Sequence, residues 1–170
     1  TGNAANSDIC QDGMDVVFLI DYTGSMSNAI TGVKNGINNI VTEIQSQSNG
    51  NYRLGLVLFD GTSTQLQNNY LTQSDFYINL PPSQKINTGA NVITCVEKMS
   101  AIGNQSTFAT HLSYLDQPNG PTGMDLGAGN ECGGSAAYEV IQNSFAGQWR
   151  SNVLKLIILI TDDQPTESST

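Results

Sequence analysis

The chain has 170 residues, which is enough for one domain with a buried core. It is acidic, with six Lys and Arg residues against fifteen Asp and Glu, a formal net charge of −9 and a pI near 4.1. This balance argues against nucleic acid or an anionic membrane as the main partner, since no basic patch can displace counterions, and it favours a cation.

Three apolar runs predict strands of a sheet that is covered on both faces. They are Met14–Ile20 (MDVVFLI), Tyr52–Phe59 (YRLGLVLF) and Val153–Ile160 (VLKLIILI). Their nearly continuous content of Leu and β-branched residues is typical of parallel strands. Between the first two, apolar residues at spacings of three and four predict an amphipathic helix. These residues are Ile30, Val33, Ile37, Ile40, Val41 and Ile44.

The middle of the chain predicts shorter elements. Asp60 and Gly61 indicate a turn into an antiparallel edge strand over residues 62–72, and residues 81–89 (PPSQKINTG) are predicted as loop. Helices are predicted over 91–102, 106–115 and 135–145, the last after a Gly-rich segment. The whole predicts an α/β fold, a doubly wound, mostly parallel sheet with helices on both faces.

Polar side chains follow the first and the last predicted strand. The sequence DYTGSMS begins at Asp21, directly after the first strand, and TDDQP begins at Thr161, after the last one. The carboxyl ends of parallel strands meet at one edge of a sheet, so Asp21 and Asp162 are expected to approach each other.

Alternate residues of the first loop offer oxygen ligands. Asp21, Thr23 and Ser25 would present one carboxylate and two hydroxyls to one point, and Asp162 would add a second carboxylate. Oxygen ligands suit a hard cation such as Mg²⁺, with Mn²⁺ or Ca²⁺ as alternatives. The other interpretation is that the hydroxyls only cap the following helix.

Two catalytic interpretations fit the sequence less well than a metal-binding site does. A strand followed by Asp resembles the nucleophile loop of haloacid-dehalogenase phosphatases, but those need a second Asp where this chain has Thr23. The one histidine, His111, completes no nucleophilic triad, although Asp116 lies near it in sequence. We therefore expect a binding module and no enzyme.

Four ordered landmarks resemble the von Willebrand factor A domain family. DYTGSMS after VVFLI resembles its DxSxS motif, with Thr23 in place of the first Ser, and ILITDDQP resembles its later TD strand end. GAGNECGGSAAYEVI looks like the GGGDxPE segment of the hemicentin-like branch, and QWRSNVLKLIILITDDQP is similar to the run that follows it there. The resemblance implies a domain over residues 12–165, an N-terminal extension over 1–11, and a tail at 166–170 leading to a missing C-terminal portion.

The resemblance also implies a metal-ion-dependent adhesion site. Asp21, Thr23 and Ser25 match its first loop and Asp162 its third, while Asn130 or Glu131 is the candidate in the second, with Thr122 as a fallback. In the family, an acidic side chain of a protein partner completes the coordination of the metal.

Cysteines and one glycosylation triplet indicate an extracellular setting. Cys10, Cys95 and Cys132 form no CxxC pair, and we predict a Cys95–Cys132 disulfide that leaves Cys10 over; three free thiols are the alternative. Asn104 begins an Asn-x-Ser glycosylation triplet. No apolar run reaches the length of a membrane span.

Two functions are consistent with these features. The first is a secreted or cell-surface adhesion module that binds an acidic side chain of a protein through Mg²⁺. The second is a structural subunit of an extracellular matrix or filament, in which the metal site is vestigial or is filled by a neighbouring subunit.

Overall fold

A computed structural model of the chain describes residues 13–60, 76, 79–88, 91–115 and 132–162. Five strands form one sheet in the order β3-β4-β2-β1-β5. The strands are β1 (Met14–Asp21), β2 (Tyr52–Asp60), β3 (Lys85–Asn87), β4 (Val92–Glu97) and β5 (Leu154–Ile160). β1 pairs in parallel with both β2 and β5, whereas β4 runs antiparallel to β2 and β3 antiparallel to β4. The sheet is therefore mixed, with a parallel centre.

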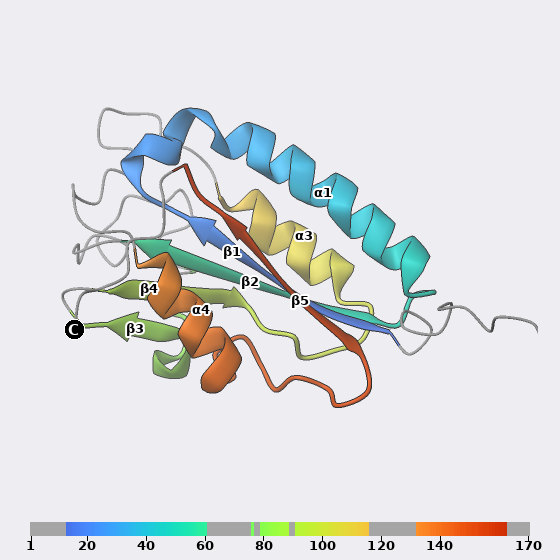
Figure 1. Cartoon of the computed structure of the whole chain (residues 1–170). Coiled ribbons are helices and arrows are strands. Elements are labelled where there is room, and N and C mark those ends of the chain that lie inside the picture. Colours follow the sequence, from blue (N-terminus) through green and yellow to red (C-terminus); the bar gives the residue numbers. More distant parts are fainter. Residues whose placement is uncertain (1–12, 61–75, 77–78, 89–90, 116–131, 163–170) are drawn as a thin grey trace, which may run out of the picture.

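Helices cover both faces of this sheet (Figure 1). α1 (Ile30–Gln47) and α3 (Gln105–Ser113) lie on one face, and α4 (Gly133–Gln142) lies on the other. Two short 3₁₀ helices, η1 (Gly24–Asn28) and η3 (Pro82–Gln84), precede α1 and β3. The predicted α/β architecture is confirmed.

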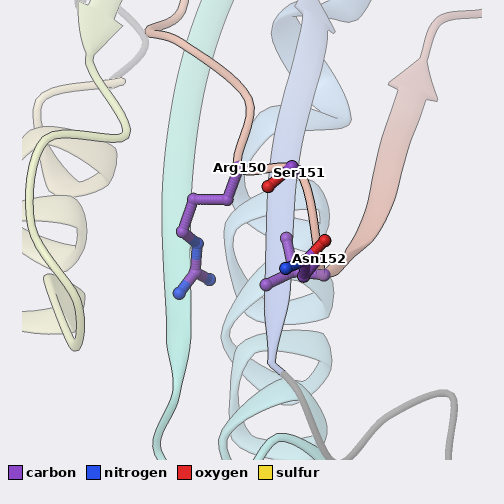
Figure 2. Close-up of a pocket in the computed structure, with 4 residues that line it drawn as sticks. Arg150, Ser151 and Asn152 are labelled. Atoms are coloured by element: carbon purple, nitrogen blue, oxygen red, sulfur yellow. The ribbon is translucent and has the colours of Figure 1, made fainter.

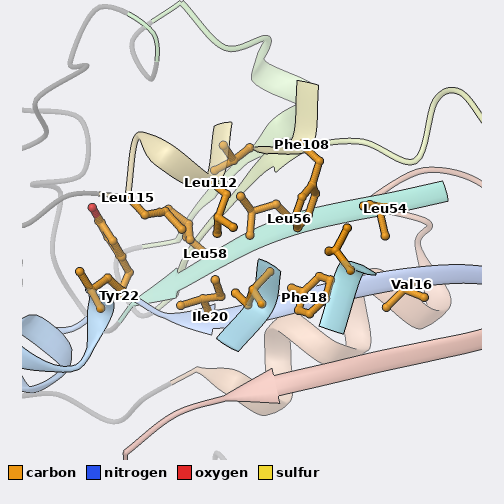
Figure 3. Close-up of a cluster of buried hydrophobic side chains, with 14 of the residues drawn as sticks. Val16, Phe18, Ile20, Tyr22, Leu54, Leu56, Leu58, Phe108, Leu112 and Leu115 are labelled. Carbon is orange, nitrogen blue, oxygen red and sulfur yellow. The ribbon is translucent and has the colours of Figure 1, made fainter. Parts of the chain in front are cut away.

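The core is built around β1, whose eight residues are all buried. Alternate side chains of a strand point to opposite faces, so one strand feeds both layers. Phe18 and its alternate neighbours pack with β2 under α3, as Figure 3 shows, while Val17 and Leu19 join the cluster beneath α4. This double burial explains why the strand is a continuous apolar run.

The predicted α1 stripe is largely confirmed. Ile30, Ile37, Val41 and Ile44 are buried, whereas Ile40 is 38% exposed. The chain then turns at Asn49 and Gly50, which both have positive φ, and enters β2 beside β1. β1, α1 and β2 thus form a strand–helix–strand crossover between two parallel neighbours.

Two predictions for the middle of the chain are wrong. Residues 91–102 do not form a helix, because Val92–Glu97 is strand β4, buried over its whole length and paired with β2. Residues 81–89 are not all loop, since they contain η3 and β3. The β-branched residues of VITCV favour a strand once β2 offers it a partner edge. The edge strand predicted over 62–72 lies outside the described residues.

β5 differs from β1 although both are apolar. Among the described strands it pairs on one side only, with β1, and its side chains are partly exposed. Leu159 is 38% exposed. β5 is thus an edge strand with apolar residues on both faces.

Candidate functional site

The carboxyl ends of β1 and β5 lie side by side, as the sequence predicts. The parallel register pairs Ile20 with Ile160, so Asp21 and Thr161, the next residue on each side, are neighbours. The sheet thereby joins two loops that are 140 residues apart in sequence.

Asp21 is fully buried, and both of its carboxylate oxygens accept hydrogen bonds. Oδ1 accepts one from the Thr23 backbone N–H at 2.9 Å and one from the Thr23 hydroxyl at 2.7 Å. Oδ2 accepts one from the Thr161 hydroxyl at 2.8 Å. All three donors are neutral groups, so the negative charge of the carboxylate is stabilised but not neutralised.

Ser25 connects this arrangement to the second carboxylate. Its hydroxyl donates to Asp162 Oδ1 at 3.0 Å and lies 3.0 Å from Thr23 Oγ1. One continuous series of contacts, which we call the hydroxyl–carboxylate chain, therefore links Thr161, Asp21, Thr23, Ser25 and Asp162 in that order. Ser25 and Asp162 are exposed, so the series opens to solvent at that end.

The hydroxyl protons are too few for all the contacts in the hydroxyl–carboxylate chain. Thr23 and Ser25 each carry one hydroxyl proton, so they have two protons for the three oxygen–oxygen contacts Asp21–Thr23, Thr23–Ser25 and Ser25–Asp162. Either hydroxyl could be the donor in the 3.0 Å contact between Thr23 and Ser25. With both carboxylates ionised, one of the three contacts therefore has no proton in it, and a cation near these oxygens would turn the repulsion there into attraction.

The donor set also fits a small hard cation by its dimensions. In an octahedron with metal–oxygen distances of about 2.1 Å, adjacent oxygens lie about 3.0 Å apart. The successive oxygen pairs Asp21–Thr23, Thr23–Ser25 and Ser25–Asp162 lie 2.7, 3.0 and 3.0 Å apart. Within the described part of the chain no three His, Cys, Asp or Glu side chains gather into a metal site, so a cation here would depend on the hydroxyls.

Thr23 does not cap the helix that follows it. It occupies the N-cap position of η1 but makes no side-chain capping bond, and Ala29 precedes α1 without one. The hydroxyls of Thr23 and Ser25 instead bond to Asp21 and Asp162. The capping interpretation is therefore wrong for these two residues. The second-loop candidates Asn130, Glu131 and Thr122 lie outside the described residues.

The predicted disulfide between Cys95 and Cys132 is not formed. Both side chains are buried and neither is part of a disulfide, and the thiol of Cys132 lies 4.0 Å from the carbonyl oxygen of Val92. Burial raises the pKa of the Cys95 thiol to about 12. Cys10 lies outside the described residues.

The predicted glycosylation of Asn104 is incompatible with the fold. The side chain is 8% exposed, and its amide nitrogen donates to Leu54 O at 2.8 Å and to Glu97 Oε1 at 2.9 Å. Both N–H groups are thus used inside the domain. Glu97 also contacts His111 Nδ1 at 2.6 Å, which gives the one histidine a structural role beside Phe76 and Tyr114.

A second polar cluster, which sequence reasoning missed, lies at the amino end of β1. Asp15 is fully buried, and its carboxylate accepts bonds from the guanidinium groups of Arg53 and Arg150 at 2.5 to 2.9 Å. Burial works to raise the pKa of Asp15, but these hydrogen bonds outweigh it and hold the pKa below its usual 3.8. An Asp inside an apolar run, with Trp149–Arg150 before the last strand, was the available signal.

The pocket in Figure 2 adjoins this second cluster. It has a volume of about 490 Å³ and is lined by Arg150, Ser151, Asn152 and Val153. The guanidinium of Arg150 is already bonded to Asp15, Asn51 Oδ1 and Met14 O. The arginine therefore supports the fold at the amino end of β1.

The fold and the hydroxyl–carboxylate chain define an α/β domain with its candidate site at the carboxyl edge of a central parallel strand pair. The model of the von Willebrand factor type A domain matches residues 15–170, so the chain belongs to that family. Domains of this family are commonly adhesion and protein-interaction modules. No curated protein matches the chain. None of the helices in the described ranges has the length and apolarity to cross a membrane.

Proposed function

We propose that this domain binds a protein partner through a divalent cation held by Asp21, Thr23, Ser25 and Asp162. The observation that carries the proposal is the hydroxyl–carboxylate chain, in which two carboxylates and two hydroxyls make three oxygen–oxygen contacts with only two hydroxyl protons. Mg²⁺ is the proposed ion because it prefers oxygen ligands in octahedral geometry, and Mn²⁺ or Ca²⁺ are alternatives. When bound, the cation would attract a carboxylate of the partner.

The chain's own residues have distinct parts in this proposal. The carboxylate of Asp21 is buried and orients the Thr23 hydroxyl, while Ser25 and Asp162 are exposed and face the incoming partner. Asn130 or Glu131, with Thr122 as the fallback, would complete the second loop. The role we propose is binding and not catalysis, because the described groups that contact these four side chains are hydroxyls, carboxylates and one backbone amide, with no histidine, cysteine or lysine among them.

The setting that we propose is extracellular, either secreted or at the cell surface. The low Lys and Arg content and the acidic composition support it. The buried thiols of Cys95 and Cys132 form no disulfide, so they do not support an extracellular setting.

The second candidate function is a structural subunit of an extracellular matrix or filament, with the metal site filled by a neighbour. The apolar edge strand β5 favours this candidate, since its outer side is not paired among the described strands. The two functions differ in what Asp21→Ala does. It abolishes divalent-dependent binding in the first and leaves assembly unchanged in the second, which light scattering of the two proteins distinguishes.

The primary test is calorimetric titration of Mg²⁺, Mn²⁺ and Ca²⁺ into metal-free protein. We expect saturable binding that is lost in Asp162→Ala, an exposed position where the substitution should not affect folding. Glu43→Ala is the matched control because it removes an exposed carboxylate from α1. Absence of binding in the wild type, or equal binding in Asp162→Ala, would contradict the proposal.

A further inference from the structure

Thr161 is the one described donor to Asp21 that does not belong to Asp21's own loop. The carboxylate of Asp21 is fully buried, so its orientation depends on the groups around it. Thr23 supplies two donors to Oδ1, and Thr161 supplies the donor to Oδ2 at 2.8 Å from the end of the neighbouring strand. The two sides together fix the plane of the carboxylate.

We infer that Thr161 is a positioning residue of the cation site, an inference that rests on the proposed function. Its hydroxyl holds Asp21 so that Oδ1 faces Thr23, and the next residue, Asp162, accepts the bond from Ser25. One strand end therefore provides both the orienting hydroxyl and the second carboxylate. Removing the hydroxyl would free Oδ2 and let the Asp21 carboxylate turn away from Thr23.

The expected effect is on affinity more than on folding. Groups that orient metal ligands without touching the metal typically change metal affinity by about 10- to 100-fold when they are removed. Thr161→Val keeps the β-branched shape and removes only the hydroxyl, while Thr161→Ser keeps the hydroxyl. Thr42→Val is the matched control, because Thr42 is exposed on α1 and its hydroxyl bonds only to Asn38 O, four residues earlier.

Two measurements test the role of Thr161. The first is the Mg²⁺ dissociation constant by calorimetry, for which we expect an increase of about 10- to 100-fold in Thr161→Val, near-wild-type values in Thr161→Ser and no change in Thr42→Val. The second needs no metal. Hydrogen exchange of the Thr23 backbone N–H, which donates to Asp21 Oδ1, should accelerate in metal-free Thr161→Val and not in the other two variants.

The outcomes separate this inference from the proposed function. Wild-type affinity together with wild-type exchange at Thr23 in Thr161→Val would overturn the positioning role. A general loss of exchange protection across β1 and β5 in that variant would also overturn it, since the hydroxyl would then support the fold alone. If the wild-type protein binds no metal, the proposed function fails, whereas the exchange of the Thr23 amide still decides whether Thr161 positions Asp21.

Discussion

Each end of β1 has a fully buried aspartate, and the two carboxylates are stabilised by different kinds of groups. Asp15 and Asp21 lie on the same face of the strand, six residues or about 20 Å apart, and both are fully buried. Asp15 is bonded to the guanidinium groups of Arg53 and Arg150. Asp21 is bonded to two hydroxyls and one amide, and the exposed Asp162 adds a second negative charge beside them.

The two ends differ in whether the described part of the chain supplies a positive charge to the carboxylate. A buried carboxylate is costly unless it is paired, and the arginines at the amino end pair it from within the chain. At the carboxyl end neither Asp21 nor Asp162 forms an ion pair with a described Lys, Arg or His. The amino end is a structural clamp made of Arg53, Asp15 and Arg150, whereas the charge at the carboxyl end is the one that the proposed cation would neutralise.

The largest expected effect comes from breaking the clamp. Asp15→Ala should lower the free energy of unfolding by about 3–5 kcal/mol, because it leaves two partly buried arginines without their carboxylate. Urea denaturation at neutral pH measures this loss. Asp162→Ala, which removes an exposed carboxylate, serves as the control, and a loss below about 1 kcal/mol in Asp15→Ala would show that the clamp is not structural.

The second-largest effect is expected from adding metal, which should stabilise the protein through the carboxyl end of β1 and not through the amino end. At a Mg²⁺ concentration about 100 times its dissociation constant, the free energy of unfolding should rise by about 2.7 kcal/mol, and a chelator should reverse it. Thermal or urea unfolding with and without Mg²⁺ gives this increment. It should vanish in Asp162→Ala and persist in Glu43→Ala; an increment of equal size in both variants would place the ion elsewhere.

A third buried carboxylate, Glu97, extends the comparison to pH. Burial works to raise the pKa of Glu97, but hydrogen bonds from His111, Asn104 and Thr107 outweigh it and hold the pKa below its usual 4.5. A pKa lowered by folding stabilises the protein above the unfolded-state value and ceases to do so as the pH falls through the folded-state value. The stability difference between wild type and Glu97→Gln should therefore be largest near neutral pH and narrow below pH 4.5.

Urea denaturation over a pH series measures this narrowing. Glu139→Gln, which changes a partly exposed carboxylate on α4, is the control and should show no such trend. A difference that stays constant down to the acid limit would mean that the Glu97 carboxylate is not stabilised in its ionised form.

The smallest effect is expected for Ser25→Ala in the absence of metal. Ser25 is exposed, so its loss should change the free energy of unfolding by no more than about 0.5 kcal/mol. The same variant should bind Mg²⁺ more weakly, which calorimetry measures. Ser46→Ala, an exposed serine on α1, is the control, and a large loss of stability in Ser25→Ala alone would give the hydroxyl–carboxylate chain a structural purpose like that of the clamp.

Local pattern predicted the central elements because their burial leaves a periodic trace. β1, β2 and β5 are apolar runs, and α1 has a stripe at helical spacing. β4 was missed because VITCVEKMSAI fits a helix equally well by composition, and only its pairing with β2 decides for a strand. Pairing between distant segments cannot be seen in a window of a dozen residues.

The candidate site was predictable in its ligands but not in its supports. Asp21, Thr23, Ser25 and Asp162 follow strand ends, and the register of β1 and β5 brings them together as expected. The Thr161 hydroxyl and the Arg53–Asp15–Arg150 clamp depend on which side chains turn toward each other in the folded chain. The same holds for Asn104, whose side-chain amide is buried and donates to Leu54 O and Glu97 Oε1, 50 and 7 residues away in sequence. These two hydrogen bonds make the glycosylation triplet unusable in the folded domain.

The outer edge of β5, which pairs with no other described strand, bears on how molecules with this edge uncovered meet one another in solution. An unpaired strand edge with apolar side chains attracts other strands, while a net charge of −9 keeps the molecules apart. Because salt shortens the range of that repulsion to about 10 Å at 0.1 M ionic strength, colloidal stability should fall as the ionic strength rises. If Mg²⁺ binds as proposed, magnesium salts would thus act twice, through the ion held at one edge of the sheet and as a screening electrolyte around the whole molecule.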